Sequence, residues 1–71
     1  MKELRCTEHT VDNDHSVLIV EREGLYECFV GAKQYAFEYM FGLPVDQQSF
    51  EDACKIAIAN APDYYDLFED E

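Results

Sequence analysis

The most constraining feature of this sequence is an unbroken aliphatic run, Val17 to Val20, placed just before a turn. Aliphatic residues of this kind, β-branched ones above all, fit the pleated surface of a sheet. Glu23-Gly24 then supplies a glycine that can take positive φ, and apolar residues resume from Leu25 to Val30. The sequence therefore predicts a β-hairpin with strands over 16–22 and 25–30.

A weaker strand is expected before the hairpin. Residues 4–10 alternate, with Leu4 and Cys6 on one face and polar side chains on the other. The Asp12-Asn13-Asp14 stretch follows, and short polar side chains of this kind bond back to the local backbone and favour turns. These patterns predict a three-stranded antiparallel sheet.

Residues 32–43 allow two interpretations. Apolar side chains recur at helical spacing through Ala32, Tyr35, Ala36, Tyr39, Met40 and Leu43, and Gly42 with Pro44 resembles a helix stop. The alternating aromatics Tyr35, Phe37, Tyr39 and Phe41 favour a strand instead. The stop signal decides for a helix here, on which Phe37 and Phe41 form a second aromatic stripe that either packs internally or stays exposed.

A second helix is predicted from Phe50 to Ala61. Ser49 suits the N-cap, acidic residues occupy the first turn, and Pro62 ends the helical pattern. Residues 63–71 form a short acidic helix or tail, on which Asp63, Asp66 and Asp70 would project as a ladder. The expected fold is one α+β domain over residues 1–71, a three-stranded antiparallel sheet followed by two helices (βββαα) with this acidic end.

The motifs for chemistry are weak, so no enzyme, metal or cofactor is expected. A calcium loop starting at Asp12 fails because its sixth position is Val17, where a glycine is needed. The three cysteines lack paired spacing and are expected to be packed thiols. A nucleophile–base pair of Cys28 with His9 or His15 has no spacing to support it.

Charge is the strongest functional signal. The formal net charge is -11, and residues 36–71 hold nine carboxylates against the single base Lys55. Such a field disfavours direct binding of nucleic acid or anionic membranes and favours a basic partner surface, chiefly one that binds nucleic acid. The predicted partner-binding residues are carboxylates and aromatics of this half: Glu38, Glu51, Asp52, Asp63, Tyr64, Tyr65, Asp66, Phe68, Glu69 and Asp70.

The chain resembles in type the small acidic inhibitors that phages and mobile elements encode: anti-CRISPR proteins, anti-restriction proteins and the uracil-glycosylase inhibitor. The resemblance lies in length, in acidity and in the aromatics interleaved with Asp63, Asp66 and Asp70, and no sequence motif is shared. Anti-CRISPR proteins fit best in length and α+β build, which implies binding to a CRISPR effector complex and a block of target-DNA binding.

The alternative is a non-catalytic regulatory or adaptor module, either monomeric or a homodimer built through Phe37 and Phe41. No apolar run exceeds four residues, whereas a membrane span needs about 20. A soluble, cytoplasmic protein is therefore expected, in the host cytoplasm if a phage encodes it.

Overall fold

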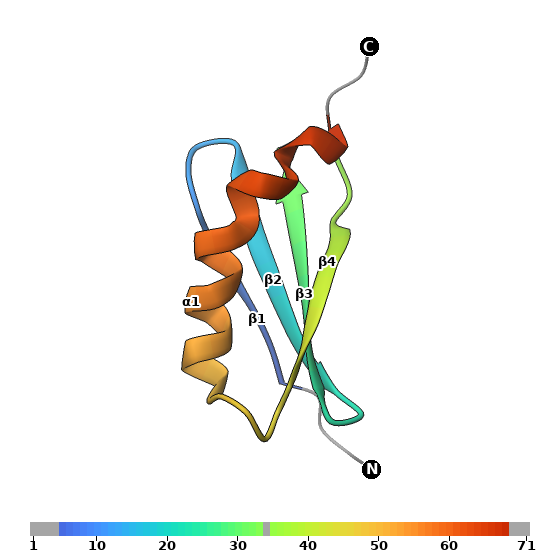
Figure 1. The fold of residues 1–71 in the computed structure, drawn as a ribbon. Coiled ribbons are helices and arrows are strands. Elements are labelled where there is room, and N and C mark those ends of the chain that lie inside the picture. Colours follow the sequence, from blue (N-terminus) through green and yellow to red (C-terminus); the bar gives the residue numbers. More distant parts are fainter. Residues whose placement is uncertain (1–4, 34, 69–71) are drawn as a thin grey trace.

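The computed structural model describes residues 5–33 and 35–68, which form a four-stranded antiparallel sheet with one α-helix on one face (Figure 1). The strands follow chain order across the sheet, β1-β2-β3-β4. The elements are β1 (Arg5–Thr10), β2 (His15–Arg22), β3 (Leu25–Ala32), β4 (Glu38–Pro44), α1 (Phe50–Asn60) and the 3₁₀ helix η1 (Ala61–Phe68).

The central hairpin is the predicted one. Glu23 and Gly24 have φ of 55° and 81°, and two successive positive φ angles make the two-residue turn whose twist matches the flanking strands. Arg22 pairs with Leu25 directly across it. The β1–β2 hairpin is confirmed as well, with Arg5 opposite Glu21 and Thr10 opposite Ser16.

The prediction of three strands and two α-helices is wrong, although the α+β class is confirmed. Residues 38–44, which were expected to end a helix, form β4 instead. Met40 is an extra residue against β3, because Cys28 pairs with Phe41 and Phe29 pairs with Tyr39. This β-bulge changes the phase of the strand, so Met40 and Leu43 both reach the core although they are three residues apart. The bulge thus imitates helical spacing.

The apparent helix-stop signal also has another cause. Gly42 lies within β4, and a Cβ placed there would be 3.1 Å from the Tyr39 hydroxyl. The glycine therefore makes room for a neighbouring aromatic side chain. Pro44 ends β4, which is an edge strand, where a missing N–H costs little.

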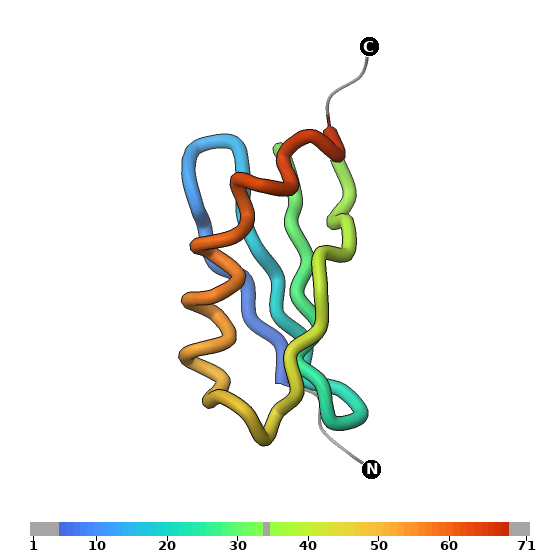
Figure 2. Tube along the Cα trace, in the orientation of Figure 1, coloured from blue at the N-terminus to red at the C-terminus, as the bar shows by residue number. Residues whose placement is uncertain are grey.

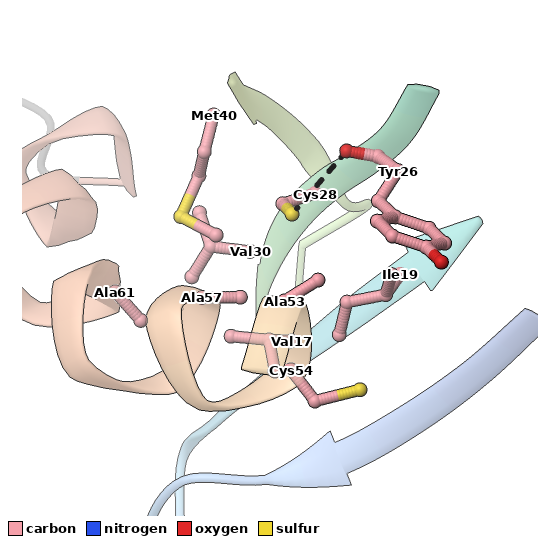
Figure 3. Packing of buried hydrophobic residues seen from close by; sticks show 10 residues of the cluster. All are labelled: Val17, Ile19, Tyr26, Cys28, Val30, Met40, Ala53, Cys54, Ala57 and Ala61. Carbon is pink, nitrogen blue, oxygen red and sulfur yellow. Dashed lines mark hydrogen bonds between the residues drawn. The ribbon is translucent and has the colours of Figure 1, made fainter. Parts of the chain in front are cut away.

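The core lies between α1 and the inner face of the sheet, which is the face that α1 covers. Val17, Ile19, Cys28 and Val30 are the largest fully buried side chains. Figure 3 shows how small helix residues meet them, which lets α1 approach the sheet closely. The complete cluster is Val17, Ile19, Tyr26, Cys28, Val30, Met40, Ala53, Cys54, Ala57 and Ala61.

The predicted second helix is confirmed as α1, with the Ser49 side chain accepting a hydrogen bond from the Asp52 backbone N–H. After Asn60 the chain continues as the 3₁₀ helix η1 and crosses the end of the sheet (Figure 2). None of the helices in the described ranges is long and apolar enough to span a membrane.

Candidate functional site

The candidate site is the end of the domain where the β1–β2 turn, the β3–β4 connection and η1 come together (Figure 1). We call it the acidic end, because it carries the exposed carboxylates of Asp12, Asp14, Glu38, Asp63 and Asp66. Among the described residues, Lys33 is the Lys or Arg side chain that lines the two surface hollows of this end. A strong negative potential at this end follows from that imbalance.

The β1–β2 turn is held by the Asp12 side chain. Its Oδ1 accepts hydrogen bonds from the backbone N–H groups of Asp14 at 2.8 Å and His15 at 2.9 Å. The His15 Nδ1 lies 3.0 Å from the same oxygen. These contacts hold the pKa of the Asp12 carboxyl below its usual value. The hydrogen bond from the Asp14 N–H has the largest effect, followed by that from the His15 ring. The turn is therefore organised by its own carboxylate.

The 3₁₀ helix η1 is fastened to this turn by an aromatic stack. The ring of Tyr65 lies parallel to the ring of His15, with 3.6 Å between centroids and 11° between planes. Its hydroxyl donates to Asp12 Oδ2 at 3.4 Å. Burial raises the pKa of the Tyr65 hydroxyl, and the negative charge of Asp12 raises it further. Tyr65 is thus a structural link between residues far apart in the sequence.

Two further aromatic contacts complete the attachment of η1. Phe68 meets Tyr35 of the β3–β4 connection at 5.4 Å between ring centroids, and Tyr64 meets Phe41 of β4 at 5.8 Å. The aromatics predicted as partner anchors therefore pack partly within the domain. Their partner-binding role stays a prediction, now limited to the parts of the rings that remain outside.

Two hollows open onto solvent around His15 and Lys33. One, of about 360 Å³, lies along the β1–β2 turn, Gly31 and Phe37. The other, of about 410 Å³, is bounded by Tyr65 and Phe68. Half of the Tyr35 side chain is exposed between them. The acidic end therefore offers aromatic surface beside carboxylates.

The structure divides the predicted site residues between the two ends of the domain. Glu38, Asp63 and Asp66 lie at the acidic end, whereas Glu51 and Asp52 begin α1 at the opposite end. The 11 residues of α1 separate them by about 16 Å. Asp63 and Asp66 stand one turn apart on η1, because a 3₁₀ helix has three residues per turn. Glu69 and Asp70, the other residues of the predicted ladder and tail, lie outside the described residues.

Four residues of this site were not among the predicted partner-binding residues: Asp12, Asp14, His15 and Tyr35. The signal for the first two was present, since the Asp-Asn-Asp stretch already predicted a turn. Its position beside η1 depends on the pairing of β1 with β2 and on the Tyr65 stack. Only the folded chain brings these segments together.

Neither metal nor thiol chemistry gains support from the site geometry. Among residues 5–33 and 35–68, no group of three or more His, Cys, Asp or Glu side chains could hold a metal ion. Burial raises the pKa of the Cys28 thiol to about 11, with a smaller contribution from Cys54. A reactive cysteine needs the opposite shift. Cys6, which was expected to be packed, is exposed.

Comparison of the chain with protein-family models, with curated proteins and with solved structures found no match. The residues of the acidic end therefore carry the functional inference.

Proposed function

We propose that this protein is a small acidic inhibitor that binds the basic nucleic-acid-binding surface of a partner protein through its acidic end. The observation that carries the proposal is the set of five exposed carboxylates at the acidic end, of which Asp12 and Asp14 line the same hollows as Lys33. Among the described residues, the Lys and Arg ion pairs lie elsewhere, between Arg5 and Glu21 and between Arg22 and Glu27. Asp12 contacts His15 at the acidic end, and the carboxylates of Asp14, Glu38, Asp63 and Asp66 are left to attract an external base.

The rigidity of this end supports the same function. Asp12 fixes the turn, and the Tyr65 stack fixes η1 against it, so four of the five carboxylates are held on two connected supports. The fifth, Glu38, begins β4. Preorganised groups lose less conformational entropy on binding. Complementary charge would speed the encounter with a basic surface, and the exposed parts of Tyr35 and Leu67 would supply apolar contact.

The resemblance in type to anti-CRISPR proteins makes guide-loaded CRISPR effector complexes the first targets to test. An effector holds its nucleic acids in a positively charged channel, which suits an acidic ligand of this size. Inhibition would then consist of blocking target DNA. A cytoplasmic location, in the cell where the effector works, belongs to the same proposal.

Two variants of equal net charge test the proposal. The first carries Asp63→Asn and Asp66→Asn at the acidic end. The matched control carries Asp46→Asn and Glu51→Gln at the opposite end. Each is immobilised beside the parent protein, bacterial lysate is passed over it, and bound proteins are released with duplex DNA and identified by mass spectrometry.

We expect the parent and the control to retain the same DNA-released protein, and the acidic-end variant to retain it with roughly tenfold lower affinity at low salt. Purified partner must then lose labelled DNA when the parent protein is added. Equal retention by both variants would reject the acidic end as the contact, and the absence of any DNA-released protein would reject the function.

A second candidate function is an interaction module that forms a homodimer through the outer face of the sheet. The outer face, opposite α1, carries Tyr39, Phe37 and Leu25, whose side chains are 53%, 37% and 37% exposed. Phe41 does not belong to it, because it packs toward Tyr64. Light scattering at low and high salt tests this function: a dimer lost on Tyr39→Ser supports it, and a monomer throughout removes it.

A further inference from the structure

The two edges of the sheet are built differently. The β4 edge is interrupted by the Met40 bulge and by Gly42 and ends in Pro44. Such features protect an edge strand against pairing with another chain. The β1 edge has none of them: its six residues pair with β2 in unbroken register and include neither Gly nor Pro. β1 is therefore the edge open to a further strand.

The phase of the β1 ladder shows which backbone groups face outward. The Val11 N–H donates to the His15 carbonyl at 2.9 Å, in continuation of the β1–β2 register. Hydrogen-bonded pairs alternate along an antiparallel ladder, so the odd-numbered residues of β1 bond to β2. The N–H and C=O groups of Cys6, Glu8 and Thr10 consequently point away from the sheet.

A groove lies beside this edge. It has a volume of about 340 Å³ and runs between β1 and α1, whose packing is against β2 and β3. Phe50, Cys54 and Ile58 give it an apolar side. Its remaining lining consists of Thr7, His9, Glu51 and Lys55. The His9 Nε2 is buried and has no hydrogen-bond partner within the described part of the chain.

We propose that β1 binds an extended basic peptide of a partner protein as a fifth strand of the sheet. Backbone bonds to Cys6, Glu8 and Thr10 would give affinity, and alternate side chains would enter the groove, as in other cases of strand addition. On the outer face the neighbour of the added strand is Glu8, which favours Lys or Arg opposite it. This surface does not depend on the acidic end binding its target.

The charge of the chain selects this occupant over a second copy. Each copy carries a net charge of -11, so two copies paired at this edge would repel each other unless salt screens the charge. The groove requires an apolar side chain and the acidic domain favours a positive charge. A peptide that alternates small apolar residues with Lys provides both, because its apolar side faces Phe50 and Ile58 and its charge complements the domain.

The test uses a capped eight-residue probe in which Val and Lys alternate four times. Binding is followed by fluorescence anisotropy, and hydrogen exchange of ¹⁵N-labelled protein locates the probe. Saturating probe should slow exchange of the Cys6, Glu8 and Thr10 amides at least about tenfold, since these amides are otherwise open to solvent.

Two forms of the probe separate strand addition from charge attraction without changing the protein. N-methylation of every Val amide blocks one edge of an extended peptide, and N-methylation of every Lys amide blocks the other, at equal charge. One form should lose binding and the other should keep it. In the protein, Glu8→Pro removes an outward N–H that β2 does not use, and Glu8→Gln is the control that keeps it.

We expect Glu8→Pro to weaken probe binding roughly tenfold, the order of one lost backbone hydrogen bond, and Glu8→Gln to weaken it much less. The proposal is overturned if both methylated probes bind alike, if no probe binds, or if the edge amides stay unprotected. Protection without any probe, together with a dimer in light scattering, would assign the edge to a second copy and overturn it as well.

Discussion

Truncation of Ile19 tests which face of β2 is covered by α1. Ile19 is fully buried, lies between Thr7 of β1 and Cys28 of β3, and belongs to the core cluster. Ile19→Ala removes three carbon atoms, about 2.4 kcal/mol at about 0.8 kcal/mol per buried group. The cavity left behind raises the expected loss to about 3–4 kcal/mol.

This loss is large for so small a domain, whose total unfolding free energy should be about 4–10 kcal/mol. Urea unfolding followed by circular dichroism measures it, with an unchanged m-value as the sign that only stability has altered. If Ile19→Ala does not fold, Ile19→Val should still fold and lose about 1 kcal/mol.

The matched control is Leu18→Ala, which also removes three carbon atoms from the neighbouring residue. Leu18 is only half-buried, because it faces outward across from Phe29. Its truncation should cost about 1 kcal/mol. A one-residue slip in register exchanges the two faces of a strand. Equal losses for the two variants, or a larger loss for Leu18→Ala, would therefore refute the register in which Ile19 faces α1.

Three further results are expected. A thiol reagent should modify Cys6 at once and the two buried thiols only as the domain opens, so rapid reaction of all three would contradict the core. Burial raises the pKa of the Cys28 thiol to about 11. The protonated thiol therefore contributes its full share of the folding stability below about pH 9. We expect the unfolding free energy to fall by about 2–3 kcal/mol as pH rises toward 11. Urea titrations of Cys28→Ala should show a smaller fall. The depressed pKa of Asp12 stabilises the fold above about pH 3.8. That stability is lost as pH falls further, and Asp12→Asn should show a shallower acid transition by circular dichroism.

The acidic end was only partly predictable. Asp63, Asp66 and Glu38 could be selected from charge alone, since carboxylates in a short chain must lie at the surface. Tyr64 and Tyr65 could not be assigned, because an aromatic beside acids has the same sequence pattern whether it packs inward or meets a partner. The stack on His15 joins residues 50 positions apart, and no local pattern encodes it.

The sequence by itself determined the central hairpin and α1. Glu23-Gly24 admits the positive φ angles that the turn requires, and Ser49 satisfies a backbone N–H at the helix start. Both signals act within a few residues. Only the tertiary structure decided that residues 38–44 form a strand. Their helical spacing and apparent stop signal predicted a helix in spite of the aromatic alternation, but pairing with β3, with Met40 accommodated in a bulge, made them a strand. This pairing is stable because β4 satisfies the backbone groups at the edge of β3 and its side chains cover the core.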